Sequence, residues 1–298
     1  MRLRVKELEA AHFSRNLLLG PGGTLDEALV QRAQVLYNTG RPVGALRNLI
    51  LGVRDFREQN AEGGAEVIPL RFRRAWRAVR KWESTEPGEC HIPLPELHWK
   101  AMIGVCLLMG TELFLQVAEQ LILCFGAALR PGEGLALRVR DLVFAVTLGY
   151  SVDRTFVRLE HHKGVQRGHG RPQHATLRDP VLSQWLRRRA AGRDPEARLW
   201  QSPPTHFRRF FDQVVVRCGL QTCGFTPSSL RAGAATALYI ADAPVGDVAW
   251  ALRHRSPETL RFYIQELGAA LARSAVPGSL PRLEVFARAA AVLLSGSH

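Results

Sequence analysis

The sequence predicts a mainly α-helical protein of two domains, the second of which contains a small antiparallel β-sheet. Three observations support this fold class. Apolar residues recur at helical spacing through most of the 298-residue chain. The segment 83–95 (ESTEPGECHIPLP) contains three prolines and a glycine, which end helices and suit a linker. Residues 139–160 instead place apolar residues among turn residues, which is typical of short strands.

These observations divide the chain into three parts. A helical domain is expected over residues 1–83, a linker over 84–95 and a larger, mostly α-helical domain over 96–298. A length near 300 fits two domains. Because 46% of the residues are hydrophobic, each domain can bury an ordinary core.

The first domain is expected to contain three helices, over residues 25–36, 43–56 and 70–82. Thr24 precedes the first helix, and Asp26 and Glu27 lie in its first turn, as is typical of a helix start. In the second helix the apolar residues recur at a spacing close to 3.6.

The third of these helices is strongly basic. Residues 70–82 carry five arginines and one lysine and no acidic residue. Arg73, Arg77 and Lys81 lie at positions i, i+4 and i+8, so they share one face and repel one another. A polyanion would relieve that repulsion, which favours a contact with the DNA backbone over a merely solvated basic face.

In the second domain, helices are expected over residues 96–109, 112–124 and 180–191. Short strands are expected within 139–160. From Thr205 to the end the pattern is helical, with breaks near 222–227 and 274–281.

The composition points to a nucleic-acid partner. The formal net charge is +13, and arginine supplies most of the basic excess. The planar guanidinium can bind phosphate in a bidentate way, so an arginine-rich surface favours nucleic acid. A basic protein that is merely soluble, or one that contacts acidic membranes, is the alternative on composition alone.

Cysteine usage and hydropathy indicate an intracellular protein, cytoplasmic or nuclear. The five cysteines are odd in number, and no close pair has the spacing of zinc ligands, which is typical of reduced core thiols. Residues 102–123 are the most apolar stretch, but two glutamates and two glutamines interrupt it, so it is expected to be a buried helix rather than a membrane span.

Three segments of the second domain carry the candidate chemistry. The stretch 126–142 (GAALRPGEGLALRVRDL) contains Arg130 and Glu133. The stretches 228–233 (SSLRAG) and 252–263 (LRHRSPETLRFY) contain Arg231, His254 and, nine residues after the histidine, Tyr263. Lys163 lies between these arginine segments in a glycine-rich turn, HHKGVQRGHGR.

In these residues the chain resembles the tyrosine recombinase (phage integrase) family. That family has a first arginine box, Leu-Arg-x-x-Glu followed by Leu-x-Leu-x-x-x-Asp, which matches residues 129–141 here. Its second box has an arginine, then a histidine, then a tyrosine nine residues later, which matches Arg231, His254 and Tyr263. Its lysine lies in a β-hairpin between the boxes, where Lys163 lies. The match covers residues 96–263, preceded by a helical domain of suitable size.

The resemblance implies an enzyme that breaks and rejoins DNA in site-specific recombination or integration, carried by a mobile element. Tyr263 would attack a phosphodiester to give a 3′-phosphotyrosine and a free 5′-hydroxyl. Arg130 and Arg231 would bind that phosphate, because negative charge builds on its oxygens in the transition state. Lys163 would protonate the leaving oxygen.

The remaining roles follow from the same resemblance. His254 would hydrogen-bond the phosphate or help to handle the tyrosine proton, and Glu133 would orient a guanidinium or support the fold. No metal or other cofactor is implied, because the phosphotyrosine retains the bond energy. Residues 1–83 would form a core-DNA-binding (SAM-like) domain, residues 96–298 the catalytic domain, and four protomers would act on two DNA duplexes.

Two positions depart from the family pattern. Ser228 stands where the family has a histidine or lysine three residues before the second arginine. Serine can hydrogen-bond but is a poor base. Arg253 stands where the family has a glycine before the histidine. A catalytically impaired, recombinase-derived DNA-binding protein is therefore an alternative, and a type IB topoisomerase is another, because it uses the same residue types.

Four histidines, His161, His162, His169 and His174, raise the question of a metal site. No cysteine or carboxylate cluster completes a ligand set near them in the sequence. A solvated polar turn is the better interpretation, and no metal is expected.

Overall fold

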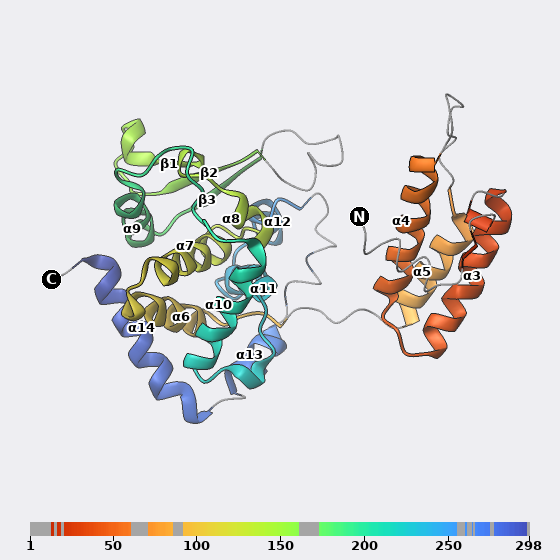
Figure 1. The fold of residues 1–298 in the computed structure, drawn as a ribbon. Helices are drawn as coiled ribbons and strands as arrows, with labels where there is room; N and C mark the ends of the chain where they lie inside the picture. The colour runs from red at the N-terminus through yellow and green to blue at the C-terminus, as the bar shows by residue number, and fades with distance from the viewer. Residues whose placement is uncertain are drawn as a thin grey trace. The chain divides into compact units, whose positions relative to one another are not determined.

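In a computed structural model, the described residues are 13–14, 17–18, 21–60, 71–85, 92–160, 173–254, 260, 264, 266–274 and 277–296. The chain forms two compact units, Met1–Glu89 and Cys90–His298 (Figure 1). The boundary between these units lies within the segment 84–95, and each unit has its own hydrophobic core.

The N-terminal unit contains α3 (Gly22–Asn38), α4 (Val43–Asn60) and α5 (Arg73–Thr85). These are the three helices that the sequence predicts, although α3 begins at Gly22, before Thr24. The buried carboxylate of Asp26 accepts hydrogen bonds from the backbone N–H groups of Arg74 (3.0 Å) and Ala75 (2.9 Å). Asp26 thereby satisfies donors that the first turn of α5 would leave unpaired, and it fixes α3 against α5.

The C-terminal unit is mainly helical. Its α-helices are α6 (Glu96–Met109), α7 (Glu112–Gly126), α8 (Pro131–Ala136), α9 (Pro180–Ala190), α10 (Pro204–Arg217), α11 (Pro227–Ile240), α12 (Val245–Ala251), α13 (Glu266–Ser274) and α14 (Leu280–Ser295). Most of α6 and α7 is buried, as expected for an apolar stretch at the centre of a core. Among the described helices, none is both long enough and apolar enough to cross a lipid bilayer.

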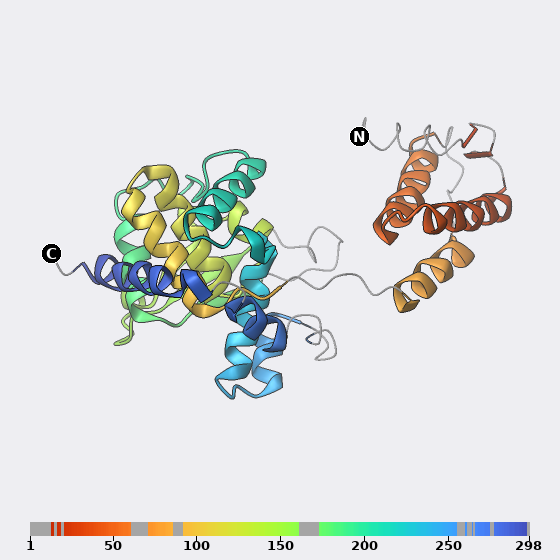
Figure 2. The same cartoon turned by 90° about the horizontal axis from the view of Figure 1, so that it is seen from below.

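The last helix, α14, packs against α6 (Figures 1 and 2). Gly104 makes this close approach possible. A Cβ atom at this position would lie 2.0 Å from the carbonyl oxygen of Phe286. The two helices can therefore meet backbone to backbone only where α6 carries no side chain.

A small antiparallel sheet has the strand order β1 (Leu142–Phe144), β2 (Thr155–Leu159), β3 (Gln173–Leu177). In its register, Val157 pairs with Leu142 on one side and with Ala175 on the other, and all three side chains are buried. The prediction of strands within 139–160 is confirmed. The third strand was not predicted, because its sequence QHATL is short and half polar. His174 lies in this strand rather than in a turn.

Four cysteines, Cys106, Cys124, Cys218 and Cys223, are buried with free thiols, as the sequence predicts, and Cys90 lies outside the described residues. Burial raises the pKa of Cys124 and of Cys218 to about 12. These two thiols are therefore protonated near neutral pH and behave as small apolar side chains.

Candidate active site

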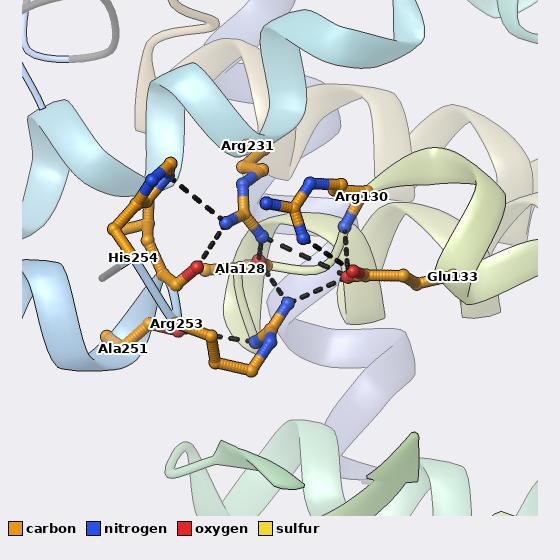
Figure 3. Close-up of polar contacts among 8 residues, drawn as sticks. Ala128, Arg130, Glu133, Arg231, Ala251, Arg253 and His254 are labelled. Carbon is orange, nitrogen blue, oxygen red and sulfur yellow. Dashed lines mark hydrogen bonds and ion pairs between the residues drawn. The ribbon is translucent and has the colours of Figure 1, made fainter. Parts of the chain in front are cut away.

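Four of the residues that the sequence singles out meet in the C-terminal unit: Arg130, Glu133, Arg231 and His254 (Figure 3). They come from the start of α8, from α11 and from the turn after α12. The turn is held by a backbone hydrogen bond of 2.9 Å from His254 to Ala249. The fold thus brings together the two arginine segments, which the sequence alone left far apart.

Glu133 orients Arg130 at the start of α8. Arg130 is the residue before the first helical turn, and Pro131 follows it at a position where a helix tolerates proline. The backbone N–H of Arg130 donates to Glu133 Oε2 at 2.9 Å, and its guanidinium Nη1 donates to Glu133 Oε1 at 2.7 Å. Because Glu133 is buried and the Arg130 side chain is 35% exposed, the carboxylate anchors a guanidinium that solvent can reach.

Arg231 lies deeper, with a side chain that is only 2% exposed. Its guanidinium donates hydrogen bonds to the carbonyl oxygens of Ala128 and Leu252. Its Nη2 also lies 3.4 Å from His254 Nε2. Since a guanidinium only donates, a hydrogen bond at this contact would use Nε2 as the acceptor.

Arg253 is the residue that the sequence analysis did not place in the site. Its backbone has φ +54°, the left-handed region that glycine adopts easily, which explains why a glycine suits this position. Its side chain turns into the cluster, where Nη2 donates to Glu133 Oε2 at 2.8 Å and to the Ala128 carbonyl at 3.3 Å (Figure 3). The signal in the sequence was a charged residue at a glycine position. That pattern does not predict its partner, Glu133, which lies 120 residues away in the sequence.

Burial and the neighbouring charges shift the pKa values of Glu133, His254 and Arg253, and burial lowers that of Arg253. Burial alone would raise the pKa of Glu133, but Arg253 and the hydrogen bonds from Arg130 outweigh burial and lower it. Burial, with Arg231, Arg130 and Arg253, lowers the pKa of His254 to about 4. Near neutral pH the cluster therefore holds three guanidinium cations, one carboxylate and a neutral imidazole. An excess of two positive charges is suited to an anion such as a phosphodiester.

Three predicted residues lie near the cluster or outside the described part of the chain. Ser228 is half-buried in the first turn of α11, one helical turn before Arg231. Lys163 and Tyr263 lie outside the described residues, so their positions stay predictions. On either side of Tyr263, Leu260 is buried and Ile264 packs against the core, and the Ile264 N–H donates to the Leu260 carbonyl at 2.8 Å.

The basic helix of the N-terminal unit borders a groove. Arg73 and Arg77 line a hollow of about 450 Å³ between α4 and α5. Further side chains in its wall are Ile50, Leu51, Arg54, Arg71, Phe72, Trp76 and Arg80. Lys81 is exposed on α5 but does not line this groove. The groove combines five arginines with an indole and other apolar surface, a composition suited to a nucleic-acid backbone.

Metal ligands do not gather in the part of the chain that the structure describes. No group of three or more histidine, cysteine, aspartate or glutamate side chains there could hold a metal ion. His161, His162 and His169 lie outside the described residues.

Comparison with known proteins reveals the fold but no close sequence relative. No protein-family model matches this sequence, and no curated protein matches it. The XerH site-specific recombinase, in a post-cleavage complex with a palindromic difH substrate, matches with a TM-score of 0.53. The two chains share 13% sequence identity, and the match covers 93% of this chain and 76% of the XerH chain.

A second solved structure has a similar fold. The Tn1549 transposon integrase, in complex with transposon right-end DNA, has a TM-score of 0.51 and 15% identity. That match covers 92% of this chain and 98% of the integrase chain. The small antiparallel sheet on a mainly helical unit fits the same comparison. The fold prediction made from the sequence is confirmed: this chain has the fold of the tyrosine recombinases and integrases.

Proposed function

We propose that this protein is a site-specific recombinase or integrase that breaks and rejoins double-stranded DNA through a 3′-phosphotyrosine at Tyr263. The observation that carries the proposal is the cluster of Arg130, Arg231 and His254 around buried Glu133. The likeness of the fold to recombinase and integrase structures supports it, although a fold by itself does not assign a reaction.

The proposed reaction uses the cluster to bind one phosphate. The Tyr263 hydroxyl oxygen forms a bond to phosphorus, and the bond from phosphorus to the 5′-oxygen breaks. The phenol proton passes to solvent or to His254, which otherwise hydrogen-bonds the phosphate, and Lys163 donates a proton to the leaving 5′-oxygen. Arg130 and Arg231 stabilise the negative charge that develops on the non-bridging oxygens. The later attack of a DNA 5′-hydroxyl reverses these steps and releases Tyr263.

A second candidate is a recombinase-derived protein that binds DNA without cleaving it. The burial of Arg231 favours this candidate, because its guanidinium is engaged with two backbone carbonyls and only 2% of its side chain is exposed. A phosphate would have to reach a guanidinium that is almost wholly buried. Ser228, which is a poor base, points the same way.

We propose that the N-terminal unit contacts the DNA backbone through the groove between α4 and α5, which Arg73 and Arg77 line. Lys81, exposed on the same helix, would extend the contact beyond the groove. A homotetramer on DNA is part of the same proposal. The XerH and Tn1549 structures, which are complexes with DNA, support the choice of DNA as the partner.

The test is formation of a covalent protein–DNA adduct on a nicked suicide substrate, from which the released 5′-hydroxyl strand diffuses away. The wild-type protein should accumulate the adduct, and Tyr263→Phe should bind the DNA but form none. Tyr239→Phe, a change at a partly exposed tyrosine of α11, is the matched control and should react like the wild type. Tight DNA binding with no adduct from the wild type would favour the DNA-binding protein. Relaxation of supercoiled plasmid without sequence preference would favour a type IB topoisomerase.

A further inference from the structure

Arg253 occupies a backbone conformation that disfavours its own side chain. Its φ of +54° lies in the left-handed region, where a Cβ atom collides with the backbone. Glycine would avoid that cost. A strained non-glycine residue persists only where its surroundings hold it, and such residues gather at functional sites. The role of Arg253 is therefore expected to follow from the contacts of its side chain.

Those contacts overlap with the contacts of Arg231. Arg253 Nη2 donates to Glu133 Oε2 at 2.8 Å and to the Ala128 carbonyl at 3.3 Å. Arg231 Nη1 donates to the same Ala128 carbonyl and lies 4.0 Å from the same Glu133 oxygen (Figure 3). Two guanidiniums thus share two acceptors, and Arg253 is the one that pairs closely with the carboxylate.

Glu133 needs this partner. The carboxylate is 4% exposed, and a buried carboxylate requires close cations. Arg130 donates its side chain to Oε1, whereas Oε2 accepts from the Arg130 backbone and from Arg253. Arg231 Nη1 lies 4.0 Å from the same Oε2, and without Arg253 no closer charge among the described residues would separate the two. Coulomb attraction would then draw Arg231 onto the carboxylate.

We propose that Arg253 is a positioning residue of the active site: it pairs with Glu133 and so leaves the charge of Arg231 available to the DNA phosphate. This inference rests on the proposed function. With Arg253 present, the three arginines and Glu133 retain an excess of two positive charges. Without it, the excess falls to one, and Glu133 binds both remaining arginines.

The experiment compares Arg253→Gln, which removes the charge, with Arg253→Lys, which retains it. Arg189→Gln is the matched control, because Arg189 pairs at 2.9 Å with another buried carboxylate, Glu119, away from the cluster. The first measurement is the single-turnover rate of adduct formation on the suicide substrate, alongside DNA affinity. The second is the titration of the His254 imidazole by NMR, since His254 faces Arg231, Arg130, Arg253 and Glu133.

We expect Arg253→Gln to slow adduct formation about 10-fold or more with DNA affinity unchanged, a smaller loss than the roughly 10²-fold expected for a group that touches the phosphate. Arg253→Lys should recover most of the rate, and Arg189→Gln should react like the wild type. The His254 titration should move to higher pH in Arg253→Gln, because one repelling cation has gone, and should stay in place in Arg189→Gln.

A wild-type rate in Arg253→Gln, or an equal loss in Arg253→Lys, would overturn the inference, because charge at this position would then be irrelevant. If the wild type itself forms no adduct, the proposed function fails, and the titration decides the inference separately. An unmoved His254 titration in Arg253→Gln would overturn it, and a shift to higher pH would uphold the electrostatic role.

Discussion

At the scale of single residues, the two arginines of the proposed phosphate site differ in their surroundings. The Arg130 side chain is 35% exposed and pairs with Glu133, whereas the Arg231 side chain is 2% exposed and holds two backbone carbonyls in place. The partly exposed guanidinium of Arg130 can contact a ligand directly. Arg231 also joins α11 to the segments before α8 and after α12, so its loss has consequences for folding as well as for chemistry.

Alanine at either arginine should therefore separate these two roles. Arg130→Ala and Arg231→Ala should each lower the rate of adduct formation by about 10²-fold or more, since each removes a donor to the developing charge. Arg231→Ala should also lower the free energy of unfolding, by about 1–3 kcal/mol, because the Leu252 carbonyl loses a donor and the Ala128 carbonyl keeps only the donor from Arg253. Urea denaturation and single-turnover assays measure the two effects. An unchanged free energy of unfolding in Arg231→Ala would contradict the structural role of Arg231.

His254 makes the stability of the folded protein depend on pH. Its pKa is lowered to about 4 in the folded protein, so between pH 6.5 and 4 the unfolded chain binds the proton first. This contribution to stability is complete above pH 6.5 and is lost as the pH falls toward 4. The midpoint of thermal unfolding should consequently fall more on acidification for the wild type than for His254→Gln. A constant difference between the two proteins from pH 7 to pH 4.5 would refute the lowered pKa.

The sequence singled out Arg130, Glu133, Arg231 and His254 as candidates from their order and spacing along the chain, and their roles in catalysis stay predictions. It did not reveal that Arg253 pairs with Glu133, because that contact depends on how the turn after α12 folds against α8. Nor did it predict the Ala128 carbonyl as a shared acceptor, because any residue type supplies a carbonyl.

At the scale of secondary structure, periodicity predicted most helices, because each buries one apolar stripe. The third strand, β3, was missed because five half-polar residues carry too little pattern. The packing of α14 against α6 could also not be predicted from the sequence. It depends on Gly104 meeting the backbone of Phe286 from a distant part of the chain.

The close packing of α14 against α6 predicts that a single methyl group at position 104 lowers the stability of the protein. Gly104→Ala should destabilise the protein by about 1–3 kcal/mol, because α14 must move away from a Cβ atom that would lie 2.0 Å from a carbonyl oxygen. The control is Gly246→Ala in α12, where a Cβ atom meets nothing within 4 Å. Alanine there should leave stability unchanged or raise it by up to about 1 kcal/mol. Chemical denaturation measures both, and an undamaged Gly104→Ala variant would contradict the close helix contact.

The groove between α4 and α5 predicts a change in salt dependence. Replacing Arg73, Arg77 and Arg80 together with glutamine should weaken binding to all DNA sequences and reduce the salt slope by up to about three, at roughly 0.9 per phosphate contact. Arg74→Gln is the control, because Arg74 is exposed beside Glu27 and does not line the groove. Fluorescence anisotropy over a salt series measures the slope. An unchanged slope in the triple variant would place the groove away from DNA.

At the scale of the whole molecule, the chain keeps the fold of recombinases and integrases at 13–15% sequence identity to the structures compared. Layers of apolar residues tolerate such divergence as long as the pattern of burial is retained. Chemistry is less tolerant, because it depends on a few side chains held in position. The two departures, Ser228 and Arg253, fall within those few, so the reaction and not the fold is the point to test.

The most direct test identifies the residue that becomes joined to DNA. The wild-type protein is incubated with the suicide substrate, the adduct is digested with protease and nuclease, and the nucleotide-bearing peptide is sequenced by mass spectrometry. We predict one modified residue, Tyr263, linked to a 3′-phosphate. A nucleotide on Tyr239 or Tyr150, or no modified peptide from protein that binds the DNA tightly, would contradict it.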